Sequence, residues 1–325
     1  MRERFDLRLL ATRVALDWPR NPFYGMVHSV FDNVLNIENK PAGLCTLSTK
    51  GNNFSHSRTG WLKVPSGFGF YKYVSPGASV FYRGGLLRID NSRILVDFRR
   101  ATRVASNCET SLKNLQWSVN SKRSWILTWD ALRLDYRKGG FTDAIRASGS
   151  SVIPSTFELR VSAKVARFVP LLMKAVYLRN IRNALASAKE LSGIGPGVTP
   201  SGDDFLTGYI FGLKNAALSQ INRDFSSQFG VRLLEPKWTS NAIVESFRRD
   251  VANRNRISGL GTLCKAIISG ANEDIIRQEI FEALQFGHTS GADSVFGLLV
   301  GLANRDSNLT EKIELALIAD ETQTF

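Results

Sequence analysis

Short apolar runs alternate with turn-forming residues in the first half of the chain. Residues 80–82, 86–89 and 94–98 are apolar runs, and Gly84-Gly85 and the Asp-Asn-Ser stretch at 90–92 separate them. Paired glycines and turns containing Asn or Asp are typical of tight connections between neighbouring strands. This pattern predicts a compact β-sheet or small barrel.

Further apolar stretches extend this half in both directions. Residues 43–48 and 61–64 flank a polar, glycine-containing loop. Residues 125–136 continue with large apolar and β-branched side chains, a stretch whose secondary structure the pattern leaves open. The expected fold of this half is mainly β.

Apolar residues in the second half recur at helical intervals. Residues 157–191 follow this spacing, with a break expected near Pro170 because proline removes a helical hydrogen bond. Further segments with helical patterning cover residues 241–252, 260–269, 273–285 and 309–318. The second half is therefore predicted to be mostly helical.

A Ser-Gly-Ser-Ser stretch at 148–151, followed by Pro154, has the composition of a linker or long turn. It lies where the strand pattern gives way to the helical one. We therefore predict an α+β protein with two parts, a β-rich domain at residues 1–150 and a helical domain at residues 151–325.

Composition favours a globular protein of the cytoplasm. Hydrophobic residues make up 43% of the chain, enough for a sizeable core. The most apolar run, at 295–303, is far shorter than the roughly 20 residues of a membrane-spanning helix, and residues 1–20 lack the apolar segment of a signal peptide. Three widely spaced cysteines, Cys45, Cys108 and Cys264, indicate reduced thiols rather than a disulfide framework.

The formal net charge is +13, which is compatible with an anionic substrate or an acidic partner. The basic residues are scattered, and no basic stripe with interleaved aromatic residues stands out, so nucleic acid is not the expected partner. The three histidines fit no recognised metal-ligand spacing.

The most unusual stretch is 193–204, Gly-Ile-Gly-Pro-Gly-Val-Thr-Pro-Ser-Gly-Asp-Asp. Gly193, Gly195 and Gly197 alternate along it, and glycine allows backbone conformations and close approaches that other residues do not. The Gly-Lys-Ser/Thr of a nucleotide-binding loop is missing. Ser201 and Asp204 have the spacing of a capping box at the start of a helix.

A second stretch, 287–293 (Gly-His-Thr-Ser-Gly-Ala-Asp), repeats this design. Both copies read Ser-Gly-x-Asp-x-x-x-Gly-x-x-x-Gly, so Ser201 matches Ser290 and Asp204 matches Asp293. Residues four apart lie on one helix face. The pattern therefore predicts two helices that pack through glycine faces, with both N-termini at one end.

Two helix starts at one place would direct unpaired amides and positive dipole ends at a common spot, which suits a small anion. Asp203 is not needed by the capping box and His288 has no counterpart in the first copy, so these two are the candidate catalytic residues. The candidate substrate-binding residues are Gly195, Gly197, Thr199, Ser201, Gly202, Asp204, Thr289, Ser290, Gly291 and Asp293.

Two other interpretations of these motifs remain open. One is a non-catalytic protein that binds a small carboxylate or phosphorylated metabolite, as a sensor or assembly subunit, since no activated nucleophile is evident. The other is a divalent-metal enzyme in which Asp203, Asp204 and His288 hold Mg²⁺. The main expectation includes no cofactor.

The two motifs resemble those of a bacterial family that includes one subunit of the oxamate carbamoyltransferase of allantoin catabolism. That family has Leu where this chain has Val198, and the second motif matches throughout. The resemblance implies a subunit of a heteromeric enzyme that moves a carbamoyl group between carbamoyl phosphate and oxamate. It also implies two further subunits, one similar to acyl-CoA synthetases.

Overall fold

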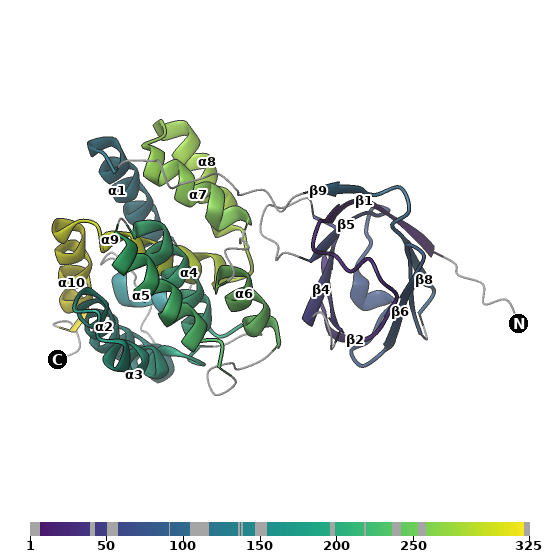
Figure 1. Cartoon of the computed structure of the whole chain (residues 1–325), viewed down its shortest axis with the longest axis horizontal. Coiled ribbons are helices and arrows are strands. Elements are labelled where there is room, and N and C mark those ends of the chain that lie inside the picture. The colour runs from purple at the N-terminus through teal and green to yellow at the C-terminus, as the bar shows by residue number, and fades with distance from the viewer. Residues whose placement is uncertain are drawn as a thin grey trace, which may run out of the picture. The chain divides into compact units, whose positions relative to one another are not determined.

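The computed structural model places two compact units along the chain, which divide at residues 108 and 109. Figure 1 shows one unit built of strands and one built of helices. The structure describes residues 7–39, 43–50, 58–90, 92–104, 117–135, 137, 139–146, 155–195, 199–217, 219–235, 242–252 and 258–321.

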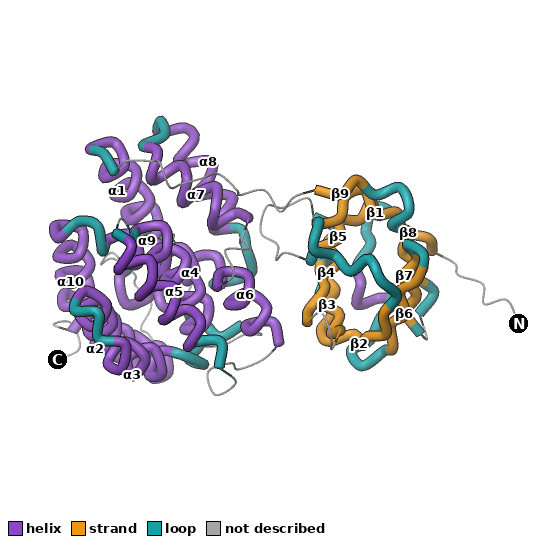
Figure 2. The backbone as a smooth tube through the Cα atoms, in the orientation of Figure 1, coloured by secondary structure: helices purple, strands orange, loops and turns teal. Residues whose placement is uncertain are grey.

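The first unit is a closed β-barrel, as the strand pattern predicts. Its described strands are β1 (Leu7–Ala15), β2 (Phe23–Val30), β3 (Val34–Asn39), β4 (Gly43–Ser48), β5 (Thr59–Lys63), β6 (Ser79–Arg83), β7 (Leu86–Ile89), β8 (Ile94–Asp97) and β9 (Thr102–Val104). Neighbouring strands follow the order β5-β4-β3-β2-β6-β7-β8-β1-β9, and β1 also pairs with β5. Eight strands therefore close a ring, and β9 pairs with the end of β1 (Figure 2).

The glycine pair predicted to form a turn connects β6 to β7. Gly84 and Gly85 have φ angles of 59° and 75°, in the left-handed region that glycine adopts without a steric penalty. The two strands pair antiparallel on either side, with Arg83 opposite Leu86. The turn at 90–92 between β7 and β8 includes Asn91, which lies outside the described residues.

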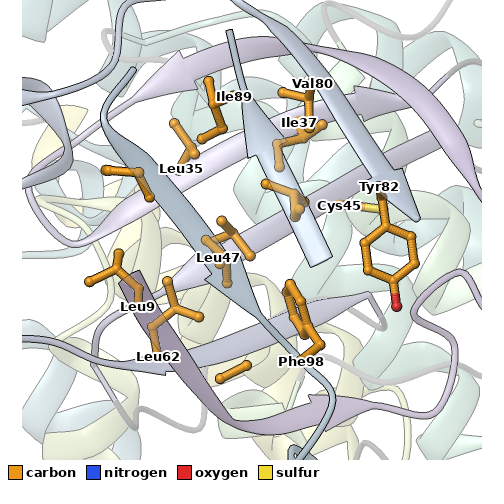
Figure 3. Close-up of a cluster of buried hydrophobic side chains, with 14 of the residues drawn as sticks. Leu9, Leu35, Ile37, Cys45, Leu47, Leu62, Val80, Tyr82, Ile89 and Phe98 are labelled. Carbon is orange, nitrogen blue, oxygen red and sulfur yellow. The ribbon is translucent and has the colours of Figure 1, made fainter. Parts of the chain in front are cut away.

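Apolar side chains from all sides fill the inside of the barrel (Figure 3). Leu35, Leu47 and Val96 are completely buried there. The Trp18 and Phe98 rings stack at the edge of this core, with centroids 4.7 Å apart. Burying such side chains stabilises the barrel by roughly 1.5–3 kcal/mol for each fully buried residue.

The second unit contains the helices. They are α1 (Val119–Arg133), α2 (Thr156–Tyr177), α3 (Ile181–Leu191), α4 (Ser201–Ala216), α5 (Gln220–Arg232), α6 (Ala242–Ala252), α7 (Ser258–Ser269), α8 (Glu273–Leu284), α9 (Ser290–Ala303) and α10 (Ser307–Glu321), with the short 3-10 helix η3 (Phe141–Ile145). The predicted α+β fold, a β part followed by a mostly helical part, is confirmed. No described helix has both the length and the apolar character needed to cross a membrane.

The stretch 125–136, grouped above with the β half, is mostly helical and lies in the helical unit. Trp125, Trp129 and Leu132 are spaced so that one face of α1 is buried. Ser118 and Ser121 form a capping box at its start. The change from strands to helices therefore falls near residue 108, earlier than the boundary at 150 expected from the linker-like composition.

Pro170 does not break the helical segment as expected. It lies inside α2, which continues to Tyr177. Val165, Val169 and Leu172 bury one face on both sides of the proline, so tertiary packing compensates for the hydrogen bond that proline cannot make. The helix instead ends just before Arg179, whose φ of 53° is unusual for a residue other than glycine.

Candidate functional site

Helices α4 and α9 pack through their glycine faces, which confirms the predicted contact. A Cβ atom on Gly208 would overlap the carbonyl oxygen of Ser294, and one on Gly297 would overlap that of Phe205. Further along, Gly212 meets Leu298 and Gly301 in the same way. The contacts advance together along both helices, so the helices are parallel and both N-termini lie at one end.

The two helix starts differ from the predicted capping boxes. The N-cap residues are Pro200 and Thr289, neither of which makes a side-chain capping bond, and the two motif serines occupy the first helical positions. The amide of Gly202 donates to the Ile194 carbonyl (2.9 Å) and that of Gly291 to the Phe286 carbonyl (2.8 Å). Because the chain folds back onto its own helix starts, these amides are not free for an anion.

A cluster of hydroxyl and carboxylate groups lies at this shared end. The Thr199 hydroxyl donates to Asp204 Oδ2 (2.9 Å) and lies 3.1 Å from the Ser290 hydroxyl of the other motif. The Phe141 amide of η3 donates to Asp293 Oδ1 (2.7 Å). Residues 91 positions apart in sequence thus meet in one polar cluster. We call it the aspartate–hydroxyl cluster, and its members are Thr199, Ser201, Asp204, Thr289, Ser290 and Asp293.

In this cluster the aspartate of each motif interacts with a serine of the other motif. Hydroxyls of Ser290 and Thr199 favour the charged form of Asp204, while those of Ser201 and Thr289 favour the charged form of Asp293. Each aspartate is therefore stabilised in its charged form by a serine of the other motif. Within the described part of the chain, Ser201 Oγ and Asp293 Oδ2 nevertheless complete no hydrogen bond of ordinary geometry.

Burial raises the pKa values of both aspartates, which makes them weaker acids than exposed aspartates. It raises the pKa of Asp293 to about 7, against the lowering effect of Ser201 and the Phe141 amide. Burial also raises the pKa of Asp204 well above its usual range, and the nearby Asp293 carboxylate adds to this effect. A charged Asp293 disfavours ionisation of Asp204, so the pair holds a proton more tightly than two separate carboxylates would.

Asp203, expected to be a spare carboxylate facing a ligand, is instead fully buried in an ion pair. Its Oδ1 accepts from Arg248 of α6 (2.5 Å), the Ser192 hydroxyl (2.6 Å) and the Gly193 amide (3.2 Å). Both charged side chains have no exposed surface. Asp203 therefore ties α6 and the glycine loop to the start of α4.

The remaining candidate residues have varied positions. His288 is exposed, and Thr289 is partly buried. Gly195 has a φ of 102°, and a Cβ there would lie 2.7 Å from Ser201 Oγ. A Cβ on Gly202 would overlap the Leu191 carbonyl, and one on Gly291 that of Ala283. Gly197 lies outside the described residues.

Sequence reasoning missed two contributors to this region. The segment 139–141 brings the Phe141 amide to Asp293, and Gly140 allows the contact because a Cβ there would lie 2.6 Å from Asp293 Oδ1. The Gly139-Gly140 pair is the one sequence signal for it. Arg248 is one of the scattered basic residues, and nothing in its neighbourhood in sequence indicates a buried partner.

Among the residues that the structure describes, no three His, Cys, Asp or Glu side chains gather to hold an ion. A surface hollow of about 510 Å³ lies against α1 and α10, and none of the candidate site residues lines it.

Fold and site together define an α+β protein whose helical unit holds a buried aspartate–hydroxyl cluster between two parallel, repeated helix starts. The family model of the oxamate carbamoyltransferase subunit AllH matches residues 191–302. This match runs from the last residue of α3 into α9 and includes both motifs, so it confirms the resemblance. No curated protein matches the chain, and no solved structure does.

Proposed function

We propose that this chain is a subunit of a heteromeric carbamoyltransferase that uses small anionic substrates of the oxamate and carbamoyl phosphate kind. The observation that carries the proposal is the family match over residues 191–302, which spans the whole aspartate–hydroxyl cluster. The other subunits, one of them similar to acyl-CoA synthetases, would complete the enzyme.

The half-buried hydroxyls of Thr199 and Ser290 are the groups of the cluster best placed to meet a substrate. The Thr199 hydroxyl donates a hydrogen bond to buried Asp204. The lone pairs of the Thr199 oxygen can therefore accept a hydrogen bond from a substrate. Oxamate and carbamoyl phosphate both carry a carboxamide NH₂ group, which donates such bonds. The cluster thereby offers a specific contact for the group that both substrates share.

In the proposed reaction the oxamate amide nitrogen forms a bond to the carbamoyl carbon. The bond from that carbon to the phosphate oxygen breaks, and phosphate leaves with the electron pair. The nitrogen loses one proton, which passes through the Ser290 hydroxyl to the carboxylate that stays ionised in the Asp204 and Asp293 pair. A buried carboxylate with a raised pKa is a stronger base than an exposed one, which suits this role.

The other candidate residues take different roles in this proposal. Asp203 and Arg248 are positioning residues, because their ion pair fixes the start of α4. His288 is exposed next to the cluster and would add a hydrogen bond to an anionic substrate. The positive dipole ends of α4 and α9 favour negative charge nearby without direct amide contacts.

The test is reconstitution of the complex with its other subunits, followed by measurement of phosphate and oxalurate formed from carbamoyl phosphate and oxamate. Ser290→Ala should lower kcat at least tenfold while the complex still assembles. The matched control is Ser269→Ala, which removes a hydroxyl that donates to the Ala266 carbonyl of its own helix. Equal loss in both variants, or no loss in Ser290→Ala, would remove the cluster from the catalytic site.

The burial of both aspartates also favours a second candidate, a non-catalytic subunit that binds a small carboxylate or phosphorylated metabolite. In that case calorimetry should show binding of phosphate, oxamate or oxalurate to the isolated chain, and Ser290→Ala should abolish it. The kcat of the reconstituted complex would then be unchanged by the same substitution.

A further inference from the structure

The positive charge of the protein is concentrated in the barrel. Residues 1–108 contain sixteen lysines and arginines but seven aspartates and glutamates, a net charge of +9 out of +13 for the chain. The family match at 191–302 does not include this unit. Apolar side chains fill its interior, so its outer surface is the part available for binding.

One outward-facing row of side chains crosses five neighbouring strands. Strand register places Tyr24 of β2 beside Phe81 of β6, then Arg88 of β7, Leu95 of β8 and Arg8 of β1. We call these five residues the outer row. The strands follow one another in the barrel (Figure 2), and at about 4.8 Å between strands the row is roughly 20 Å long.

The outer row combines exposed apolar surface with positive charge. Tyr24 is 79% exposed and its ring stacks on Phe81, with centroids 4.7 Å apart. Met26 and Leu10, on the same two strands as Tyr24 and Arg8, are also exposed large apolar residues. A monomer gains nothing from leaving such a group in water, and clustered exposed apolar residues mark interaction sites.

Acidic groups are scarce on these five strands. The single carboxylate in β1, β2, β6, β7 and β8 is Asp97, and it is buried beneath Arg8 and Arg99, whose guanidinium groups both bond to it. These contacts hold the pKa of Asp97 well below its usual range. The face thus presents arginine and aromatic groups outward, which complements an acidic surface with an apolar centre.

Such a surface fits a protein better than a nucleic acid. Tyrosine and arginine are enriched at protein interfaces and dominate their binding energy, whereas a nucleic-acid platform needs aromatic faces open to bases. Here Tyr24 and Phe81 stack on each other, and Asp97 already binds Arg8 of the outer row together with Arg99. A row of this length fits within a standard interface of about 800 Å² per partner.

We propose that the outer row docks an acidic face of another subunit of the same enzyme. This inference rests on the proposed function, because it takes that subunit as the occupant. The barrel would then serve as the assembly module, and the helical unit would carry the substrate site. The five strands of the outer row all lie within the closed ring of eight strands, so docking there uses side chains rather than strand addition.

The experiment measures binding of the full-length chain to the separately purified other subunits of the proposed enzyme, by calorimetry at low and high salt. Tyr24→Ala and Arg88→Glu should each raise Kd at least tenfold, and higher salt should weaken wild-type binding. The matched controls are Tyr71→Ala and Arg100→Glu, exposed residues of the same unit outside the outer row, which should change Kd less than twofold.

Two outcomes overturn the inference while leaving the proposed function intact. One is a complex whose Kd is unchanged by both outer-row variants. The other is tight binding of single-stranded or duplex DNA that Arg88→Glu abolishes, with subunit binding unchanged. If the wild-type chain binds none of the partner subunits, the proposed function fails and this inference fails with it.

Discussion

Asp203, Asp204 and Asp293 are identical side chains at the starts of two repeated helices, yet their neighbours differ. Asp203 meets Arg248, a full opposite charge, and forms a buried ion pair. Asp204 meets hydroxyls and another carboxylate, and its pKa rises well above the usual range. At the scale of single residues, the groups that surround each carboxylate therefore determine its role.

Replacing Asp203 with Asn should destabilise the protein strongly. The change leaves Arg248 charged in a buried position without its carboxylate, and loss of one partner of a buried pair costs about 3–5 kcal/mol. Urea denaturation would measure it. The control is a double-mutant cycle with Arg248→Met. The double variant should lose less free energy of unfolding than the two single variants lose in total. An unchanged free energy of unfolding for Asp203→Asn would contradict the ion pair.

The raised pKa of Asp293 should make stability depend on pH in the reverse of the usual direction for a carboxylate. Between its ordinary pKa near 4 and its folded value of about 7, the folded state holds a proton that the unfolded state has lost. The contribution of this group to the free energy of unfolding therefore falls as pH rises through that window, by about 1.4 kcal/mol per pH unit.

Unfolding measurements on wild type and Asp293→Asn from pH 4 to pH 8 would isolate this term. Asn keeps an oxygen to accept a hydrogen bond from the Phe141 amide but does not titrate. The free energy of unfolding of the variant should therefore rise relative to that of wild type as pH rises to about 7. A difference that stays constant across the range would show that Asp293 has an ordinary pKa in the folded protein.

At the scale of elements, α4 and α9 form a pair whose spacing depends on missing side chains. Gly208 and Gly212 on one helix and Gly297 and Gly301 on the other each face backbone atoms of the partner. Interiors packed this tightly cannot take up an added methyl group without displacement. The same contact fixes the register that brings the two helix starts together.

Gly208→Ala should therefore force the two helices apart and lower the free energy of unfolding by about 1–3 kcal/mol or more, although alanine is the better helix former. Gly230→Ala in α5 is the matched control. Its added Cβ would lie 3.2 Å from Cγ2 of Ile210, a much smaller overlap than the one with the Ser294 carbonyl at Gly208, so Gly230→Ala should lower the free energy of unfolding less than Gly208→Ala. A stabilised Gly208→Ala variant would argue against the close pair.

At the scale of the whole molecule, each unit has its own buried core. The barrel buries Leu35, Ile37 and Val96 among its own strands, and the helical unit buries Phe205 and Phe296 between its central helices, with ring centroids 5.1 Å apart. A unit with an independent core meets the main requirement for folding alone.

Fragments 1–108 and 109–325 should each fold when expressed separately. Circular dichroism should show β structure in the first and helix in the second, and each should unfold cooperatively in urea. The full-length chain is the control, since its spectrum should equal the length-weighted average of the two fragments. A fragment 109–325 without cooperative unfolding would mean that the helical unit depends on the barrel.

The sequence by itself determined the fold class and the helix pairing. Turn residues such as Gly84-Gly85 and helical spacing act locally, so the sheet and most helices could be predicted. The glycine pattern repeated from Gly208 to Gly297 has few uses other than a close helix contact, so that contact could be predicted as well. Each of these predictions depended only on residues close together in the chain or on a pattern that the chain repeats.

Only the tertiary structure decided the roles of the polar groups. Nothing local shows that Arg248 reaches Asp203 from 45 positions away, or that the Phe141 amide reaches Asp293 from 152 away. The capping boxes had the right spacing, yet Pro200 and Thr289 took the N-cap positions. The charge and hydrogen bonding of a buried group depend on everything packed around it, and packing brings together residues that the sequence keeps apart.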